Sequence, residues 1–385
     1  MLFIKSKLRK LHLKDKRVFL RVDLNIDLND IDNSFRLKAI LPTIDYLLEQ
    51  NACIILATHI GRPKGYESTL STEPIAKWFI KKQYKATHIS ELDKSLIDIA
   101  YKPKSIIILE NLRFYKGEQD LSIEFAKLLK SFAQIYVNDA FGVLHRNETS
   151  ITLLPKFFDE EHKTIGLLVE KELEELNKLI LLPGKFCLML GGAKIKDKLI
   201  LLKNLIEKID TLIILPAIVF TFWKALGKNI GKSLFEIELL AQAKEIIELF
   251  KIHNKKIIIP DNFLTINDNR LEYLNIDNFK NDTYGLAIGP ESLRLIKEEI
   301  MNADKIFYNG AMGLNEFPES LQALKQIFEY MTNSQAFTVV AGGDSTQRLQ
   351  DFHLEDKISF CSSGGGSTLK YLSEGKLLSL NSFLD

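Results

Sequence analysis

The sequence predicts an α/β protein made of two doubly wound parallel-sheet (Rossmann-like) domains joined by a hinge helix. Short apolar runs of strand length alternate with stretches of helical periodicity along the whole chain, which is the pattern of βαβ units. The 385 residues are enough for two hydrophobic cores. Residues 166–182, GLLVEKELEELNKLILL, form a long helical pattern that Pro183 and Gly184 end, and this pattern supplies the helix between the domains.

The first half of the chain contains four strand candidates. Helical patterns separate them, with apolar residues at helical spacing between Leu37 and Leu48 and again within 121–132. Such alternation indicates a parallel sheet with helices on both faces. The strand candidates are RVFLRV (17–22), CIILAT (53–58), SIIILE (105–110) and IYVND (135–139).

The second half resumes the alternation after the long helix. Its strand candidates are FCLML (186–190), TLIIL (211–215), KIIIP (256–260), YGLAIG (284–289), KIFYN (305–309), FTVVAG (337–342) and ISFCSS (358–363). We therefore expect an N-terminal domain over residues 1–165, an interdomain helix over 166–183 and a C-terminal domain over 184–376.

Composition excludes several classes of protein. The chain has 51 Lys+Arg and 50 Asp+Glu, a net charge of +1, which argues against a nucleic-acid-binding or membrane-surface protein. The charged N-terminus has no signal-peptide pattern, and the most apolar stretch, 212–223, is short and contains Pro216. Three widely spaced cysteines indicate a reducing compartment. We expect a cytoplasmic protein without nucleic-acid or membrane partners.

In the first half, each strand candidate ends in polar residues. Because parallel strands share one carboxyl edge, these side chains are expected to converge there. The set is rich in arginine, which grips phosphate and carboxylate with two hydrogen bonds, so it predicts a site for a small, highly anionic ligand. Any one of these residues alone would be interpreted as an ordinary polar residue of the protein surface. They are Asp23, Asn25, His59, Arg62, Asn111, Arg113, His145 and Arg146, with Arg36 opening the first long helix.

In the second half, the strand ends carry glycine. Four glycine loops precede helical patterns, LGGAKIKDK (190–198), NGAMG (309–313), GGDS (342–345) and GGGS (364–367). Exposed backbone N–H groups and helix N-termini bind phosphate. None of the loops fits a Walker A motif or the GxGxxG dinucleotide motif. Asp344 could serve a Mg²⁺–phosphate complex or simply cap a helix. The two halves together suggest phosphoryl transfer across a closing cleft.

The motifs of this chain resemble those of phosphoglycerate kinase, in the same order and at about the same spacing over nearly the whole length. They are RVDLNIDL, THIGRPKG, ENLRFYKGE, VNDAFGVLHR, LGGAKIKDK, NGAMG, GGDS and SSGGGS. The resemblance implies reversible phosphoryl transfer between 1,3-bisphosphoglycerate and ADP, giving 3-phosphoglycerate and ATP in glycolysis, with Mg²⁺. It also implies in-line transfer in a cleft closed by hinge bending, a monomer, and a C-terminal tail (about 377–385) that packs on the N-terminal domain.

By position, the resemblance assigns roles to individual residues. Arg36, Lys194 and Lys198 resemble the catalytic residues, and Asp344 resembles the metal ligand. The phosphoglycerate-binding set is Asp23, Asn25, Arg36, His59, Arg62, Arg113 and Arg146. The nucleotide-binding set is Gly192, Lys194, Lys198, Asn309, Glu316, Gly342, Gly343, Asp344 and Ser345.

The chain departs from the family pattern at several places, mostly around the nucleotide. Leu215-Pro216-Ala217 replace three glycines beside the adenine pocket, and the second His of an H-R-x-H element is Glu148. Other departures are Ala311, Ala287 and Lys370. They leave open a phosphoglycerate-binding protein of kinase ancestry with impaired nucleotide binding. A kinase for another small acid is a further alternative, which the intact anion site disfavours.

Overall fold

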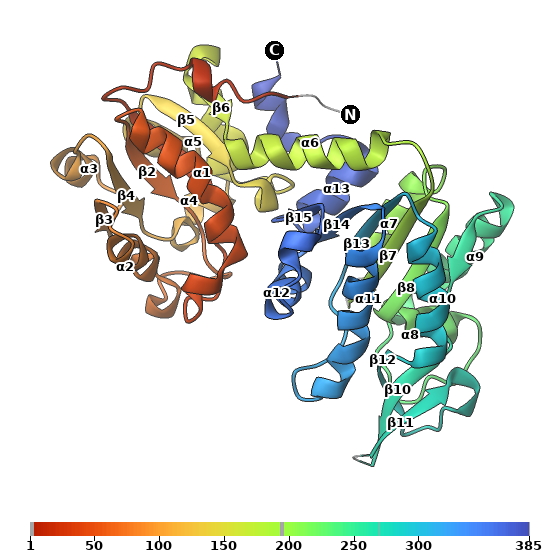
Figure 1. The fold of residues 1–385 in the computed structure, drawn as a ribbon. Coiled ribbons are helices and arrows are strands. Elements are labelled where there is room, and N and C mark those ends of the chain that lie inside the picture. Colours follow the sequence, from red (N-terminus) through yellow and green to blue (C-terminus); the bar gives the residue numbers. More distant parts are fainter. Residues whose placement is uncertain (1–3, 193–195, 269, 385) are drawn as a thin grey trace. The chain divides into compact units, whose positions relative to one another are not determined.

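The computed structural model describes residues 4–192, 196–268 and 270–384. The chain divides into two compact units, unit 1 (Met1–Glu174 and Gly375–Asp385) and unit 2 (Glu175–Glu374). Each unit contains a six-stranded parallel sheet, which confirms the predicted α/β class with two parallel-sheet domains (Figure 1). None of the described helices is both long enough and apolar enough to cross a membrane.

The sheet of unit 1 has the strand order β3-β4-β2-β1-β5-β6, and all neighbours pair in parallel. The four predicted strands are confirmed, and the two edge strands β3 and β6 are additional. Their segments, ATHI and KTI, are too short to give a strong apolar signal. The strands are β1 (Arg17–Val22), β2 (Cys53–Ala57), β3 (Ala86–Ile89), β4 (Ser105–Leu109), β5 (Ile135–Asp139) and β6 (Lys163–Ile165).

Helices cover the buried strands of unit 1. The side chain of Ser34 caps α1 by accepting a hydrogen bond from the Leu37 N–H (3.2 Å). The apolar face of α1, which includes Ile40 and Ile44, packs on alternate residues of the strands, such as Val18 and Leu20. The helices are α1 (Phe35–Glu49), α2 (Glu73–Lys81), α3 (Lys94–Ala100), α4 (Lys116–Gln119) and α5 (Ile123–Ser131).

The long helical pattern forms α6 (Leu167–Leu181), which begins in unit 1 and ends in unit 2. The C-terminal segment belongs to unit 1 and contains the short 3-10 helix η13 (Leu378–Phe383). There the Ser379 hydroxyl donates a hydrogen bond to the Leu144 carbonyl (2.7 Å). The tail is therefore attached to the loop that carries Arg146.

The main sheet of unit 2 has the order β15-β14-β13-β7-β8-β9, again parallel throughout. Its strands coincide with six of the seven runs predicted in this half, and their ends differ from the predicted ones by at most two residues. They are β7 (Phe186–Gly192), β8 (Thr211–Ala217), β9 (Lys256–Ile258), β13 (Lys305–Asn309), β14 (Phe337–Ala341) and β15 (Phe360–Ser362).

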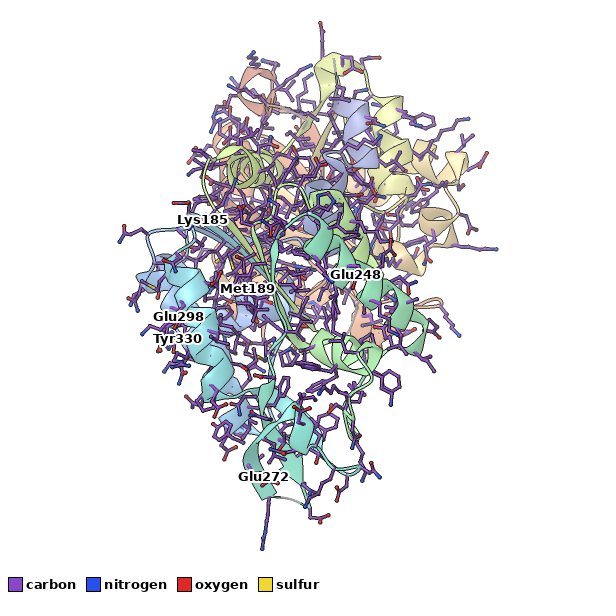
Figure 2. The ribbon with its side chains drawn as sticks, turned by 90° about the vertical axis from the view of Figure 1, so that its right-hand side faces the viewer. Lys185, Met189, Glu248, Glu272, Glu298 and Tyr330 are labelled. Carbon is purple, nitrogen blue, oxygen red and sulfur yellow. The ribbon has the colours of Figure 1, made fainter. Side chains whose placement is uncertain are left out.

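The seventh run was expected in the same parallel sheet, and that prediction is wrong. Residues 284–288 form β12 (Tyr284–Ile288), which pairs antiparallel with β10 (Asn262–Asn267) in a separate three-stranded sheet. The hairpin partner of β10 is β11 (Arg270–Asn275). The hairpin projects from one end of unit 2 (Figure 1), and Glu272 lies near its tip (Figure 2). Apolar content alone does not reveal whether a strand joins a parallel or an antiparallel sheet.

The core of unit 2 lies between its main sheet and helices α10 and α11. Met189 of β7 is fully buried in this core (Figure 2), together with Ile296 of α10 and Phe328 of α11. The helices are α7 (Lys196–Leu205), α8 (Ile218–Ala225), α9 (Leu240–Ile252), α10 (Pro290–Met301), α11 (Leu321–Asn333), α12 (Gly343–Asp351) and α13 (Gly366–Glu374).

Candidate active site

The carboxyl ends of β1 and β2 and the start of α1 meet in unit 1. Nη1 of Arg36 lies 3.1 Å from a carboxylate oxygen of Asp23 and donates to the Asn25 carbonyl (3.0 Å). The side chain of Asn25 accepts a hydrogen bond from the Gly61 N–H in the loop after β2 (2.8 Å). Three of the predicted binding residues thus hold one another in place, and Arg36 stays partly exposed, with 22% of its side-chain surface accessible.

The end of β4 fixes the same loop from the other side. The side chain of Asn111 donates to the Ile60 carbonyl (2.9 Å) and accepts from the Ile60 N–H (3.2 Å). Arg113 follows in the short 3-10 helix Leu112–Phe114, and its Nη1 donates to the Gly61 carbonyl (2.7 Å). The buried guanidinium of Arg113 is therefore set in one orientation before any ligand binds.

His59 is fully buried behind this loop, and its ring is neutral. Burial lowers the pKa of His59 well below its ordinary value, and surrounding positive charges, that of Arg21 first, lower it further. Nδ1 lies 3.3 Å from Nη2 of Arg21. Because a guanidinium can only donate, Nδ1 accepts and the ring proton resides on Nε2. Nε2 is itself buried, and no described residue accepts a hydrogen bond from it.

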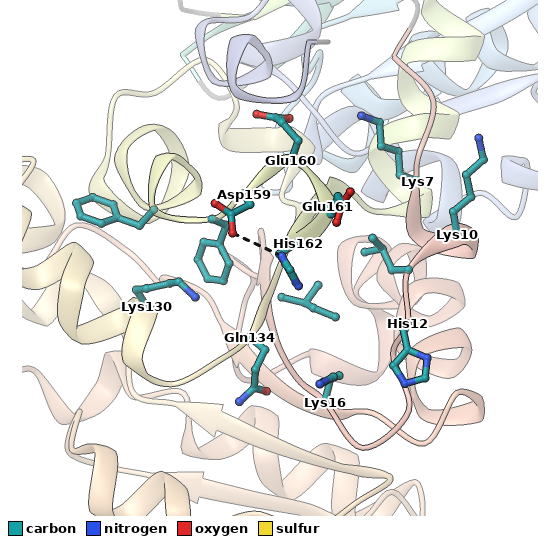
Figure 3. Close-up of a pocket in the computed structure, with 14 residues that line it drawn as sticks. Lys7, Lys10, His12, Lys16, Lys130, Gln134, Asp159, Glu160, Glu161 and His162 are labelled. Carbon is teal, nitrogen blue, oxygen red and sulfur yellow. Dashed lines mark ion pairs between the residues drawn. The ribbon is translucent and has the colours of Figure 1, made fainter.

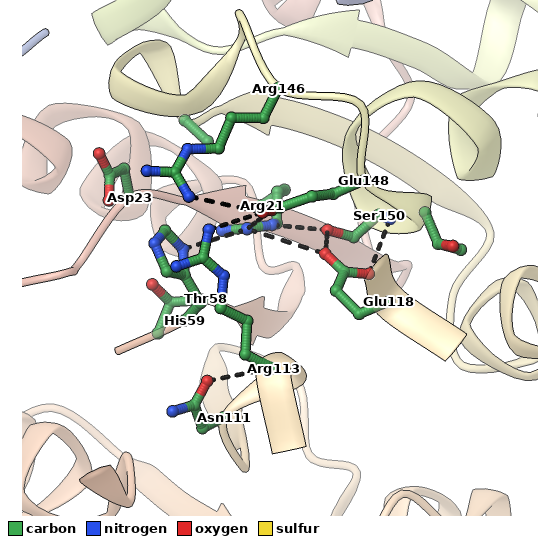
Figure 4. A network of polar contacts seen from close by, with 12 residues as sticks. Arg21, Asp23, Thr58, His59, Asn111, Arg113, Glu118, Arg146, Glu148 and Ser150 are labelled. Carbon is green, nitrogen blue, oxygen red and sulfur yellow. Dashed lines mark hydrogen bonds and ion pairs between the residues drawn. The ribbon is translucent and has the colours of Figure 1, made fainter. Parts of the chain in front are cut away.

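A buried ion-pair network lies under the arginines (Figure 4). Arg21 of β1 is fully buried, and its Nε donates to the Ser150 hydroxyl (2.7 Å). Its Nη2 lies 3.6 Å from Oε2 of Glu148 and 3.9 Å from Oε1 of Glu118. Burial raises the pKa of Glu118 to about 7 in spite of Arg21. Glu118 is therefore about half-ionised near neutral pH.

Glu148 is the carboxylate nearest the open part of the site. Its Oε1 lies 2.6 Å from Nη2 of Arg113 and 3.7 Å from Nη1 of Arg146. Burial alone would raise the pKa of Glu148, but the charges of Arg21, Arg113 and Arg146 outweigh it and lower the pKa. Glu148 is therefore ionised at neutral pH and partly neutralises the arginines around it.

A cavity of about 370 Å³ opens between these arginines in unit 1. Its lining residues are Arg62, Pro63, Lys64, Arg113, Gln119, Arg146 and Glu148. Arg62 is exposed at the cavity and contributes its charge there. Four cations and one carboxylate line this space, a composition that suits a phosphorylated ligand.

A larger cavity, of about 840 Å³, lies elsewhere in unit 1 (Figure 3). It is lined by residues that precede β1 and β5, such as Lys16 and Gln134, and by charged groups of both signs, such as Lys10 and Glu161. These are the amino ends of the strands, whereas ligands of doubly wound sheets bind at the carboxyl ends. Size alone therefore does not identify the active site.

In unit 2, two of the glycine loops touch through their backbones. Gly310 has a φ of +124°, and a Cβ atom there would lie 2.0 Å from the Gly191 carbonyl oxygen. Gly191 itself packs against Leu215 and Pro216 at the end of β8. Only glycine permits this approach and this backbone conformation. The loop after β13 is thus held against the end of β7.

Hydrogen bonds join the other glycine loops to this pair. Asn309 donates from Nδ2 to the Ala341 carbonyl (2.8 Å), and the Ser345 hydroxyl accepts from the Gly310 N–H (3.2 Å). The Gly342 N–H donates to the Gly364 carbonyl (3.1 Å). Helices α12 and α13 begin at Gly343 and Gly366, so two helix N-termini lie at the same cluster of loops. Such an arrangement binds phosphate groups.

The predicted lysines are described only in part. Lys198 of α7 is buried, and its ammonium group donates to the Gly191 carbonyl. Gly192 lies beside it, with a φ of +79°. Lys194 lies outside the described residues.

The two predicted carboxylates of the nucleotide site are both exposed. Asp344 is in the first turn of α12, and an exposed carboxylate beside these loops could hold a Mg²⁺ ion. Glu316 lies in the turn between Leu314 and Phe317. The guanidinium of Arg348 in α12 donates to Asn315 in that turn, which connects the Glu316 turn to α12.

The segment Leu215-Pro216-Ala217 directs most of its side-chain bulk into the core of unit 2. Leu215 is fully buried in the core of unit 2, and Pro216 is also buried. Only Ala217 is half-buried, with a methyl group as its side chain. The departure from glycine therefore adds little bulk at the surface of the loops.

Sequence reasoning missed three members of the buried network, Arg21, Glu118 and Ser150. One signal for Arg21 was available, because a charged residue within an otherwise apolar strand, RVFLRV, must be paired when it is buried. Glu118 and Ser150 gave no comparable signal, since their burial depends on the packing of α4 and of residues 149–153 against the sheet.

Comparisons with known proteins agree with one another. The family model described as phosphoglycerate kinase matches residues 8–376. Phosphoglycerate kinases of Dictyoglomus turgidum and Campylobacter jejuni are each 38% identical to this chain, with 96% of both chains covered. Among solved structures, phosphoglycerate kinase from Coxiella burnetii has 30% identity, covers 97% of both chains and gives a TM-score of 0.81. The enzyme from Pyrococcus horikoshii gives 0.85 at 27% identity, with 98% covered.

Proposed function

The chain belongs to the phosphoglycerate kinase family, and from this premise we propose which residues carry the family's reaction. That reaction is reversible phosphoryl transfer between 1,3-bisphosphoglycerate and ADP, which gives 3-phosphoglycerate and ATP. We assign phosphoglycerate to the basic basin of unit 1, by which we mean Asp23, Asn25, Arg36, His59, Arg62, Arg113 and Arg146. We assign the nucleotide to the glycine loops of unit 2. The observation that carries the assignment is the preset orientation of Arg36 and Arg113 beside a neutral His59.

The chemistry needs no general base. In the direction from ATP, a carboxylate oxygen of 3-phosphoglycerate forms a bond to the γ-phosphorus while the bond from phosphorus to the β–γ bridging oxygen breaks. The attacking carboxylate is already ionised at neutral pH, so the protein has to align the reactants and neutralise charge. The neutral ring of His59 fits this need, because a ring that stays neutral takes no proton from the reactants.

We assign to Arg36 the stabilisation of charge on the phosphoryl group in transfer. Its guanidinium is held by Asp23 and the Asn25 carbonyl yet remains partly exposed. Lys194 and Lys198 are assigned to the transferring group and the nucleotide phosphates, as the family resemblance implies. Asp344 is assigned to Mg²⁺, which when bound would neutralise part of the phosphate charge. In-line transfer further requires the two bound substrates to meet.

The assignment is tested by turnover of the purified protein with Mg-ATP and 3-phosphoglycerate, coupled to NADH oxidation through glyceraldehyde-3-phosphate dehydrogenase. We expect robust turnover that Lys198→Ala abolishes and Arg113→Ala weakens through a higher KM for 3-phosphoglycerate. Normal kinetics in both variants would contradict the assignment. Tight calorimetric binding of Mg-ADP would remove the alternative of impaired nucleotide binding.

A further inference from the structure

Glu148 places a negative charge where the basin is proposed to bind a negatively charged substrate. The carboxylate lines the 370 Å³ cavity together with Arg62, Arg113 and Arg146. A ligand in this cavity that contacts these arginines must also lie near Glu148. Any role of Glu148 in substrate binding rests on the proposed assignment of phosphoglycerate to the basin.

The carboxylate of Glu148 occupies the binding groups of two basin arginines. Arg113 uses Nη1 for the Gly61 carbonyl (2.7 Å) and Nη2 for Oε1 of Glu148 (2.6 Å). Arg146 directs its Nη1 to the same Oε1 (3.7 Å). A guanidinium edge that already faces a carboxylate has less capacity left for the phosphate of a substrate.

The other oxygen of Glu148 has no hydrogen bond. Within the part of the chain that the structure describes, no donor is within hydrogen-bonding distance of Oε2, although the atom is buried. Nη2 of Arg21 lies 3.6 Å from this oxygen. A carboxylate that serves only to brace a structure usually has both oxygens satisfied when it is buried, so this arrangement is poorly optimised as a brace.

The buried side of the network does not need Glu148 alone to balance its charge. Arg21 also lies 3.9 Å from Glu118 and donates to Ser150. Because the charge of Glu148 is one of the causes that raise the pKa of Glu118, its removal favours ionised Glu118 as the counter-ion of Arg21. The charge that Glu148 contributes is felt mainly on the cavity side, by Arg113 and Arg146.

We propose that Glu148 is a resident counter-anion of the basin, whose carboxylate competes with the substrate phosphate for Arg113 and Arg146 and so weakens substrate binding. In the ligand-free protein its negative charge offsets the electrostatic repulsion between Arg113 and Arg146. In the complex it lies close to a second anion and promotes release. Glu148 is thus a residue that sets affinity for the known substrate class.

The test is calorimetric titration of 3-phosphoglycerate into wild-type protein and Glu148→Gln. The amide keeps the shape and one acceptor but removes the charge. We expect the Kd for 3-phosphoglycerate to fall by about tenfold or more, because a like charge beside a bound phosphate is removed. We also expect a lower Tm without ligand, which saturating 3-phosphoglycerate restores. If Glu148 had only a structural role, Glu148→Gln would instead lower the Tm and raise the Kd for 3-phosphoglycerate.

Glu160→Gln is the matched control. It removes one negative charge from the same unit, at an exposed residue that pairs with Lys163 outside the cavity (2.7 Å). We expect its Kd for 3-phosphoglycerate to equal that of the wild type. Tightening by both variants would show a general effect of net charge and would overturn the proposal.

Equal or weaker binding by folded Glu148→Gln would also overturn it. If Glu148→Gln does not fold, Glu148→Asp replaces it, because the shorter side chain keeps the charge but withdraws it from Arg113. The proposal then predicts tighter binding of 3-phosphoglycerate. Binding by Glu148→Asp that is equal to or weaker than that of the wild type would contradict it. A wild-type protein that binds no 3-phosphoglycerate would instead refute the assignment of the basin. The two failures are therefore distinguishable.

Discussion

The basic basin of unit 1 and the glycine loops of unit 2 both present positive charge to anions, but different groups supply it. In the basin the charge resides on side chains, such as Arg36 and Arg113, which ion pairs and carbonyl groups hold in place. In the loops, backbone N–H groups and the N-termini of α12 and α13 add to the charge of Lys198, and positive φ angles at Gly192 and Gly310 shape the backbone there.

The difference shows where each site can change. A side-chain site can be altered one residue at a time, and Glu148 in the basin is such an alteration. A backbone site depends on close approach of the chain, so Gly310 is constrained while its neighbour Ala311 departs from the family pattern without filling the contact to Gly191. Single side-chain substitutions should therefore change ligand binding in the basin. Ligand binding at the loops should change when a substitution alters the backbone conformation.

The largest expected effect is that of Arg36→Ala on turnover. Removing one preset charge from the transferring group should lower kcat by about 10²- to 10³-fold. The affinity for Mg-ADP should hardly change, because nucleotide binding is assigned to the loops of unit 2. Kinetics in the coupled assay and calorimetry with Mg-ADP measure the two quantities. Lys38→Ala, which removes an exposed cation on the same helix, is the control. A near-normal kcat for Arg36→Ala would show that this charge does not stabilise the transferring group.

The buried network makes the stability of the basin depend on pH. The pKa of Glu118 is raised from 4.5 to about 7 in the folded protein, so between these values the folded chain holds a proton that the unfolded chain has released. The contribution of Glu118 to the free energy of unfolding therefore falls as pH rises from about 4.5 to 7, by up to about 3 kcal/mol. Above and below this window it is constant.

Urea unfolding of the wild type and of Glu118→Gln across this pH range measures the effect. The difference between the two free energies of unfolding should change through the window, because other groups with shifted pKa values, such as Asp139 and His59, are present in both proteins and cancel. A difference that does not vary with pH would show that the folded-state pKa of Glu118 is close to its ordinary value.

Gly310→Ala tests the backbone site. A methyl group 2.0 Å from the Gly191 carbonyl and a φ of +124° should force the two loops apart. We expect about tenfold to a hundredfold weaker binding of Mg-ADP with unchanged binding of 3-phosphoglycerate. Gly65→Ala, where an added methyl meets no atom within 4 Å, controls for the loss of a glycine as such. Undiminished ADP binding would mean that the loop contact does not shape the nucleotide site.

The smallest expected effect comes from the C-terminal tail. Ser379→Ala removes the hydrogen bond to the Leu144 carbonyl, two residues before Arg146. The loss should cost about 1 kcal/mol of stability and raise the KM for 3-phosphoglycerate about two- to fivefold. Ser382→Ala, in the same 3-10 helix, is the control. If Ser379→Ala changed the KM for nucleotide and not the KM for 3-phosphoglycerate, the expected link between the tail and the basin of unit 1 would be wrong.

Much of the fold followed from local pattern. The runs RVFLRV and KIFYN became strands with the predicted ends, because a continuous apolar run bounded by helical periods is unambiguous in an α/β chain. The prediction failed for residues 284–288, which joined an antiparallel sheet, and it did not find the hairpin of β10 and β11. Strand pairing depends on contacts between residues that are far apart in the sequence, and a local sequence pattern does not reveal those contacts.

The basin was predicted as a set of residues at strand ends but not as a network. Asp23, Asn25 and Arg113 lie where parallel strands must bring them, since the carboxyl ends share one edge. The neutral state of His59 was not predictable, because it results from complete burial among arginines. The pairing of Glu148 with Arg113 was likewise not predictable, although the sequence showed that an acidic residue replaces the His of the family pattern at this position.

Periodicity, glycine placement and motif order are properties of neighbouring residues, so the fold class, the two groups of strand-end residues and the family could be predicted from the sequence. Which atoms face one another depends on tertiary packing. Arg21 meets Ser150 across 129 residues of chain, and Arg113 meets Glu148 across 35. Desolvation and Coulomb interaction act between residues that are close in space, so protonation states and ion pairs are settled only once the chain has folded.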